Sequence, residues 1–209
     1  HRLLDRIEAL PGVQPAGANS FIPLRGLGAA TAFEIVGRPR PPRGEEYVAD
    51  VRVVTRDFFK AMGVPLVKGR LFREDDPADS ENRIVINKTM AEKYFPGEDP
   101  IGRKVRVYWN NERDDEIVGV VGDVRQDRYQ SAPVPQVYVP RTQLPYRMDM
   151  QMGLEVLVTT LVERGAGEAV SLVPALRAAV RDVDATISVA SARTVEDYAA
   201  DQLQELSQY

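Results

Sequence analysis

Proline and glycine cut the sequence into short apolar runs, and this limits the chain to short helices and strands. Among its 209 residues are 15 glycines and 15 prolines. No run approaches the roughly 18–20 apolar residues that a membrane-spanning helix needs. The apolar fraction of 44% and the charged fraction of 28% are those of a chain that folds around its own core. We therefore expect a folded α+β protein with room for one large domain or two small ones.

Helical and strand patterns alternate near both ends of the chain. Residues 2–10 place apolar side chains on one helical face before Pro11 and Gly12 end the helix. Residues 154–160 and 187–190 have strand patterns, and between them we expect a helix with Ser171 as its N-cap. This strand–helix–strand order is typical of a parallel βαβ crossover.

The middle of the chain is richer in strands and loops. Strands are expected at residues 33–36, 47–55, 83–86, 104–109, 116–121 and 136–139. Short helices are expected at residues 57–62 and after Asn87, which suits an N-cap. Residues 37–44 are so rich in proline and glycine that they predict a loop.

These patterns favour one subdomain inserted into another. Residues 1–31 and 148–209 would form a discontinuous α/β subdomain, and residues 32–147 would form an inserted, mixed and strand-rich α+β subdomain. Two consecutive domains are the alternative. Connections rich in glycine and proline around residues 25–45 and 140–153 are candidate hinges.

The chain lacks the residues that most enzymes and metal sites use. It has no cysteine, and its one histidine is His1 at the start. Disulfides, thiolate zinc sites and a serine–histidine relay are thereby excluded. We therefore expect no catalytic, cofactor-binding or metal-binding residue. A net charge of −4 also argues against a nucleic-acid partner.

Three local patterns suggest sites but have simpler explanations. The acidic residues between Glu74 and Glu81 lack the spacing and central glycine of a calcium loop, so a solvated loop is favoured. Gly119 and Gly122 are too few for a dinucleotide fingerprint, and the end of a strand is favoured there. Asn87-Lys88-Thr89 matches a glycosylation sequon, but it falls at an expected helix start.

Several segments, in this order and spacing, resemble one family. They lie at residues 9–13, 33–39, 53–66, 69–72, 85–87, 94–102, 117–124, 135–140 and 180–184. The most specific are Phe95-Pro96-Gly97-Glu98-Asp99-Pro100 and the run Gly119-Val120-Val121-Gly122. Together they resemble the extracytoplasmic (periplasmic core) domain of MacB-like ABC transporter permeases, a group that includes the duplicated permeases of acidobacteria.

The resemblance implies a non-catalytic part of a transporter. Such a domain lies between two transmembrane helices of a permease in the bacterial inner membrane and faces the periplasm or the cell exterior. It resembles a porter-like βαβ subdomain carrying an insertion. ATP is used by a separate nucleotide-binding domain or subunit, so this chain would hold no cofactor. Its implied role is to couple ATP-driven motion of the membrane dimer to export or extraction of a substrate.

The implied partners are the permease's own transmembrane helices, a second permease copy, an ABC ATPase and a periplasmic adaptor protein. The chain has no initiator methionine and starts inside a helical pattern, which is typical of a piece of a longer protein. Exposed loops are the expected sites of partner contact. The candidate contact residues are Arg38, Arg40, Arg43, Asn110, Asn111 and Arg113.

Two other functions remain open. The domain could bind a substrate or lipoprotein directly, in an apolar groove lined by Phe58, Phe59, Met62 and Leu66. A place in the core is favoured for these side chains. A hydrolase that uses paired carboxylates is the remote alternative.

Overall fold

The computed structural model mixes helices and strands in two compact units. It describes residues 2–13, 16–19, 29–74, 76, 82–108, 113–124, 132–146, 169–186, 189, 192 and 194. One unit comprises His1–Ala16 with Val158–Tyr209, and the other comprises Gly17–Leu157. The α+β fold class expected from the sequence is confirmed. The subdomain boundaries derived from the sequence stay a prediction.

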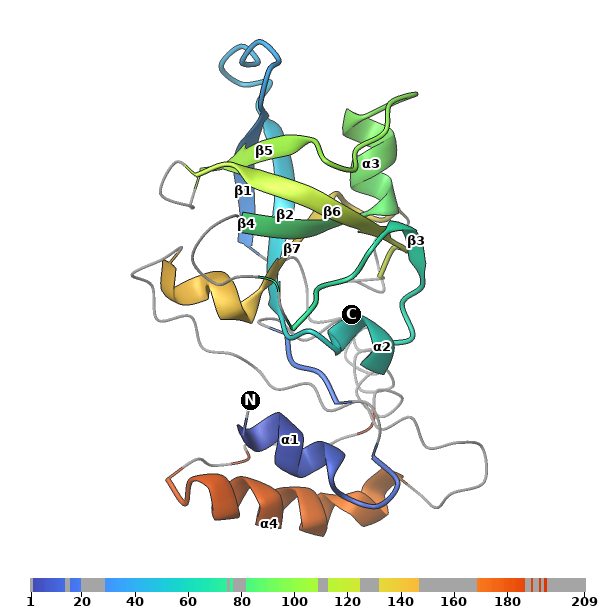
Figure 1. Cartoon of the computed structure of the whole chain (residues 1–209), viewed down its shortest axis with the longest axis vertical. Helices are drawn as coiled ribbons and strands as arrows, with labels where there is room; N and C mark the ends of the chain where they lie inside the picture. Colours follow the sequence, from blue (N-terminus) through green and yellow to red (C-terminus); the bar gives the residue numbers. More distant parts are fainter. Residues whose placement is uncertain are drawn as a thin grey trace, which may run out of the picture. The chain divides into compact units, whose positions relative to one another are not determined.

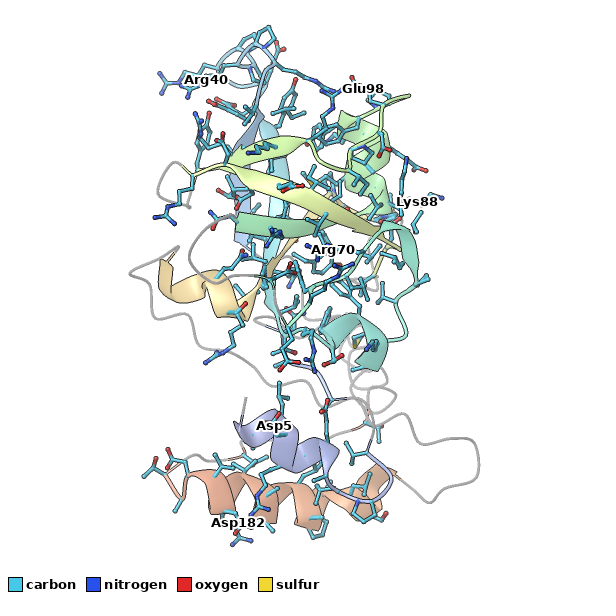
Figure 2. The ribbon with its side chains drawn as sticks, viewed as in Figure 1. Asp5, Arg40, Arg70, Lys88, Glu98 and Asp182 are labelled. Carbon is cyan, nitrogen blue, oxygen red and sulfur yellow. The ribbon has the colours of Figure 1, made fainter. Side chains whose placement is uncertain are left out.

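The first unit is built on two helices (Figure 1). Helix α1 (Arg2–Glu8) packs on α4 (Val173–Val183), which follows the 3₁₀ turn η2 (Ala169–Leu172). Their apolar faces enclose Ile7, which is buried. The opposite faces are polar, and Asp5 and Asp182 are exposed on them (Figure 2).

The start of α4 differs from the expectation. Ser171 lies in the 3₁₀ turn, and Leu172 is the N-cap without a side-chain hydrogen bond. A capping serine bonds the N–H of the third residue after it, but here that residue is Pro174, which has no N–H. The strands expected at 154–160 and 187–190 fall outside the described residues apart from Val189, so the βαβ crossover stays a prediction.

The second unit is a closed barrel. Its strands are β1 (Ala29–Ile35), β2 (Tyr47–Val54), β3 (Leu66–Gly69), β4 (Asn82–Asn87), β5 (Lys104–Val107), β6 (Asp115–Val121) and β7 (Gln136–Pro140). Pairing runs β6–β4–β7–β2–β1–β5, and β5 returns to β6 to close the ring. The pairs β2–β7 and β4–β6 are parallel, and the other pairs of the ring are antiparallel. The consecutive strands β5 and β6 pair antiparallel.

Strand β3 completes the outer edge of β6. Strand β5 pairs with the start of β6, and β3 pairs with its end, where Leu66 lies opposite Val121. Between them, Ile117 donates to the Arg103 carbonyl at 2.9 Å and Arg70 donates to the Val118 carbonyl at 2.9 Å. The backbone of β6 is therefore bonded along both edges. No strand was expected at β3, because Leu66–Gly69 is short and exposed at all four residues and so has no alternating burial pattern.

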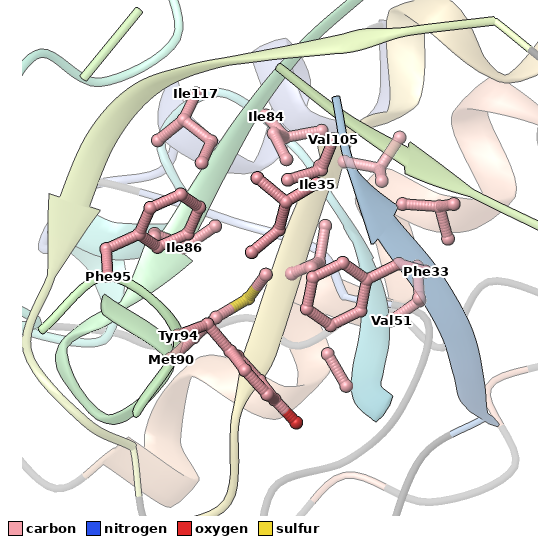
Figure 3. Packing of buried hydrophobic residues seen from close by; sticks show 14 of the residues in the cluster. Phe33, Ile35, Val51, Ile84, Ile86, Met90, Tyr94, Phe95, Val105 and Ile117 are labelled. Atoms are coloured by element: carbon pink, nitrogen blue, oxygen red, sulfur yellow. The ribbon is translucent and has the colours of Figure 1, made fainter. Parts of the chain in front are cut away.

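Alternate residues of the strands fill the barrel (Figure 3). Helix α3 (Lys88–Tyr94) adds Met90 and Tyr94 to this core. The buried cluster comprises Phe33, Ile35, Ala49, Val51, Ile84, Ile86, Met90, Tyr94, Phe95, Val105, Val107, Ile117, Val120, Val137 and Val139. Burying each large aliphatic side chain contributes about 1.5–3 kcal/mol, so this cluster is the main source of stability in the barrel.

A second apolar cluster covers the outer face of four strands. Helix α2 (Phe58–Ala61) lays Phe58 and Phe59 against side chains of β2, β4, β6 and β7. The ring of Phe59 packs edge-on against Tyr138 of β7, with 4.9 Å between ring centroids. The 3₁₀ helix η1 (Arg141–Tyr146) follows β7. This outer cluster ties α2 firmly to the barrel wall.

A bulge in β6 allows both clusters to form. The register against β4 shifts after Ile84, so that Val120 faces the inner cluster with Ile117, three residues before it, while Val121 faces the outer cluster with Val118. At Gly119, a Cβ atom would lie 2.1 Å from the Arg70 carbonyl oxygen, so only glycine fits there. Gly119 therefore lies within the strand, as the pattern at residues 116–121 predicted, and permits close backbone approach.

Candidate functional site

A loop after β1 forms one end of the barrel unit, where Arg40 and Glu98 are labelled in Figure 2. Arg38 lies at its start and is held in place. Its guanidinium donates to the Tyr94 carbonyl and pairs with Glu98, both at 2.7 Å, and it lies 5.2 Å from the centroid of the Phe95 ring. Arg38 therefore anchors the loop to α3 and the turn after it.

Arg40 is exposed over 70% of its side chain and lies beside Tyr108. Both residues converge on Glu34 of β1: Arg40 forms an ion pair with it, and the Tyr108 hydroxyl donates to it at 2.5 Å. The hydrogen bond from Tyr108 is the largest influence lowering the pKa of Glu34, and Arg40 and Arg106 lower it further against the opposing effect of burial. This cluster lies on the outer face of β1 and β5.

Glu34, Tyr108 and Arg106 were not among the sequence candidates. Strand alternation was the available signal, because Phe33 and Ile35 face the core and Glu34 must then face outward. Arg106 and Tyr108 follow the same rule on either side of the buried Val107.

The other candidate contact residues are scattered. Arg43 and Arg113 are exposed, and Asn110 and Asn111 lie outside the described residues. Arg106 pairs with Asp114 at 2.8 Å, next to Arg113. The structure thus brings Arg40 together with an acid and an aromatic ring, and it leaves Arg43 and Arg113 exposed to solvent.

The four residues of the suggested groove do not share one surface. Phe58 and Phe59 are fully buried in the outer cluster, and Met62 packs against that cluster. Leu66 is 44% exposed on β3. Phe58 and Phe59 are therefore core residues, and no open groove is formed by this set.

Within the described part of the chain, no group of three or more potential metal ligands comes together. Asp76, in the acidic segment, is instead bound by cations. Arg70 contacts both of its carboxylate oxygens, at 2.7 and 3.0 Å, and Arg83 lies 3.3 Å away. Burial alone would raise the pKa of Asp76, but the hydrogen bonds from Arg70 and Arg73 and the charges of Arg70 and Arg83 lower it overall. This carboxylate is neutralised by arginine.

Asn87 is a buried junction between three segments. Its Oδ1 accepts from the N–H groups of Met90 and Gln136, at 3.0 and 2.9 Å. Its Nδ2 donates to Asp123 at 2.7 Å and to the Val134 carbonyl at 2.9 Å. The N-cap role predicted for Asn87 is confirmed. A buried amide with both hydrogens engaged is not available for glycosylation in the folded protein.

Comparison with known families gives these features a context. Residues 9–182 match the family described as the MacB-like periplasmic core domain. The chain belongs to this family. It is accordingly a periplasmic domain of a MacB-like ABC transporter permease, as the ordered segments had predicted. No helix in the described part of this MacB-like domain has the length and apolar character to cross a membrane.

Curated relatives of this MacB-like domain are macrolide export ATP-binding/permease proteins named MacB. The protein from Aggregatibacter actinomycetemcomitans is 31% identical over 75 residues, which are 36% of this chain and 11% of that protein. The one from Neisseria gonorrhoeae is 28% identical over 79 residues, or 38% of this chain and 12% of that protein. The matched part thus spans about a tenth of these relatives.

Solved structures share the fold. The periplasmic region of MacB from Actinobacillus actinomycetemcomitans superposes with a TM-score of 0.58 at 16% identity, covering 87% of this chain and 72% of that one. The extracellular domain of the noncanonic ABC-type transporter YknZ from Gram-positive bacteria has a TM-score of 0.54 at 15% identity, covering 88% and 83%.

Proposed function

We propose that this domain couples ATP-driven motion of a permease dimer to export or extraction of a substrate, without catalysing a reaction itself. A separate nucleotide-binding domain or subunit hydrolyses the ATP. The permease lies in the bacterial inner membrane, and this domain faces the periplasm or the cell exterior. The family match over residues 9–182 carries the proposal.

The physical character of the barrel unit supports this role. A part that transmits motion must resist deformation, and a closed ring of strands with a continuous apolar core does so. Among the described residues, the Asp76 carboxylate pairs with Arg70 and Arg83. The buried side chain of Asn87 forms hydrogen bonds within the fold. These side chains bond to other parts of the fold, which stiffens it, and their polar atoms do not face a ligand site.

The partners of the proposal are the permease's own membrane helices, a second permease copy, an ABC ATPase and a periplasmic adaptor. Arg40, Arg43 and Arg113 remain the candidate adaptor contacts. Charge reversal by Arg43→Glu should weaken co-purification of an adaptor while leaving thermal unfolding unchanged. Unchanged co-purification of the Arg43→Glu, Arg113→Glu double variant would remove this surface from the proposal.

Direct binding of a substrate or lipoprotein is the weaker candidate. It required a groove lined by Phe58 and Phe59, and both rings are buried between α2 and the barrel wall. A ligand could reach them after α2 separated from the barrel, at the cost of exposing the outer cluster to water.

The proposal is tested by removing the barrel unit from the complete transporter. Residues 17–157 are replaced by a short Gly-Ser linker in the intact permease, reconstituted with its ATPase in proteoliposomes. We expect ATP hydrolysis to continue and export of erythromycin, used as the probe because the relatives are macrolide exporters, to fall about tenfold or more per ATP. Unchanged export per ATP hydrolysed would refute coupling by this domain.

A further inference from the structure

On the outer face of β1 and β5, an acid and an aromatic ring hold the guanidinium group of Arg40. Glu34 of β1 provides the carboxylate, and the hydroxyl of Tyr108, directly after β5, donates to it at 2.5 Å. Arg40 forms an ion pair with Glu34, and its guanidinium carbon lies 5.7 Å from the centroid of the Tyr108 ring. Arginine side chains pair with carboxylates and stack on aromatic faces, so this arrangement satisfies both preferences.

Glu34 and Tyr108 extend from backbone that the barrel holds in place. Strand β1 is paired with β2 on one edge and with β5 on the other. The neighbouring side chains of Phe33 and Val107 are buried in the core, and the Tyr108 N–H donates to the Ala32 carbonyl at 3.2 Å. The hydrogen bond between the two side chains then orients both of them. The positions of the carboxylate and the ring therefore do not depend on Arg40.

Arg40 is attached much more loosely than the residues that hold it. Its side chain is 70% exposed, and it lies between Pro39 and Pro41, which have no N–H to donate. In the described part of the chain, no backbone hydrogen bond ties residues 39–41 to another segment. Because an exposed ion pair contributes little free energy, Arg40 can leave Glu34 without disturbing the barrel.

The charges that remain when Arg40 leaves favour another cation. Arg106 lies 4.0 Å from Glu34, but its Nε and Nη2 both donate to Asp114, at 3.0 and 2.8 Å. Without Arg40, two carboxylates in this cluster therefore share one guanidinium group. The opposite charge of a second guanidinium group would be attracted to the Glu34 carboxylate, and an anion would be repelled by it.

An exposed apolar strip continues from Tyr108 across the sheet. Ala32 of β1 is bonded to the backbone of Tyr108 on one side and lies opposite Val48 of β2 on the other. Val48 is 43% exposed and Tyr108 is 47% exposed. Adjacent strands lie about 4.8 Å apart, so this strip reaches about 10 Å across the sheet. A small cation would leave the strip in water, whereas an arginine on a protein segment, with an apolar side chain beside it, would cover it.

From this geometry we propose that Glu34 and Tyr108 form a docking site for an arginine side chain of a partner protein, which replaces Arg40 and places a neighbouring apolar residue on Ala32 and Val48. In the free domain Arg40 occupies the site and competes with the partner. The proposal does not rest on the coupling function, because it concerns recognition on one face of the barrel unit.

The first test measures the binding of a single arginine. N-acetyl-arginine methylamide is titrated into the ¹⁵N-labelled chain, and the amide shifts of Glu34 and Tyr108 are followed. Because Arg40 occupies the site in the parent, Arg40→Ala should bind this probe about tenfold more tightly than the parent does. N-acetyl-citrulline methylamide, which has nearly the same shape without the charge, should not bind. Arg43→Ala is the matched control, because it removes an exposed arginine of the same loop and should bind as the parent does.

The site is overturned if Arg40→Ala binds the arginine probe no more tightly than the parent does. It is also overturned if adding Glu34→Gln to Arg40→Ala leaves the affinity unchanged, because this substitution removes the carboxylate charge. Thermal unfolding is measured for each variant. Should the double variant be unfolded, Tyr108→Leu in the Arg40→Ala background takes its place, with an expected loss of affinity of about threefold or more.

The second test distinguishes a protein segment from a small cation. In an extended peptide, residues two apart lie on the same side, about 6.8 Å from each other. Acetyl-Arg-Gly-Val-amide should therefore bind Arg40→Ala about threefold or more tightly than acetyl-Arg-Gly-Ser-amide, and adding Val48→Ser should remove the difference. Equal affinities of the two peptides for Arg40→Ala would overturn the protein partner and assign the site to a small cation.

Discussion

Asn87 is a buried polar side chain that holds several segments of the barrel unit together. Its amide is engaged by four hydrogen bonds that join α3, the start of β7 and the segment after β6. Composition and periodicity predicted the N-cap role, because that bond is local. The hydrogen bonds to Asp123 and Val134 join residues that only the tertiary fold brings together, so no local sequence pattern predicts them.

Asn87→Asp should destabilise the domain by about 2–4 kcal/mol at neutral pH. The substitution removes two donors and places a second carboxylate 2.7 Å from Asp123. Urea unfolding measures the change. Lys88→Ala is the control, because its exposed ion pair with Glu92 contributes less than about 1 kcal/mol. Equal stabilities of the two variants would contradict the role given to Asn87.

The Asp76 carboxylate makes the free energy of unfolding depend on pH in the acid range. The pKa of Asp76 is lowered in the folded protein. The contribution of this carboxylate to folding stability is therefore fully present above the pKa of aspartate in the unfolded chain, about 3.9, and it is lost as the pH falls through the pKa in the folded protein. Asp76→Asn should cost about 1–3 kcal/mol at pH 7, and the difference from the parent should shrink below about pH 4.

Denaturant unfolding across pH measures this dependence. Glu74→Gln is the control, because that side chain is 90% exposed and pairs only at the surface with Arg56. A difference between the parent and Asp76→Asn that stays constant from neutral to strongly acid pH would show that the carboxylate charge is not involved.

At the scale of elements, sequence patterns located most of the barrel strands but not their closure. Alternating apolar residues in β1, β2 and β5 marked one face that the structure places inside the barrel, whereas the continuous apolar run of β4 is buried on both faces. Strand β3 was missed because its side chains are exposed, and the need for glycine at Gly119 was not foreseen because the contact that requires it comes from Arg70, far along the chain. A close approach between two backbone segments that are far apart in the sequence produces no periodic pattern of residues.

The junction of β3 with β6 depends on Gly119. Gly119→Ala should cost about 1–3 kcal/mol through overpacking against the Arg70 carbonyl, measured by thermal or urea unfolding. Gly44→Ala is a matched control, since Gly44 has open space around it and a φ of 93°, so that only backbone strain of about 1 kcal/mol is added. A smaller loss at Gly119 than at Gly44 would contradict the close approach.

For the whole molecule, the sequence predicted the family through the order of its segments, and the match over residues 9–182 confirmed it. The candidate contact residues stay a prediction. Arg38 donates to the Tyr94 carbonyl and pairs with Glu98, while Glu34 and Tyr108 around Arg40 were not foreseen. Side-chain pairing across loops is decided by tertiary structure, which local residue types do not encode.

In the proposed function, this domain moves with the ATPase cycle. Its lack of cysteine allows a single spin label at the exposed position Arg43→Cys in the intact permease, once any other cysteines have been replaced. Double electron–electron resonance then gives the distance between the labels of the two permease copies, with and without trapped ATP. The account predicts that ATP shifts this distance by more than the width of its distribution. An identical distribution in both states would contradict it.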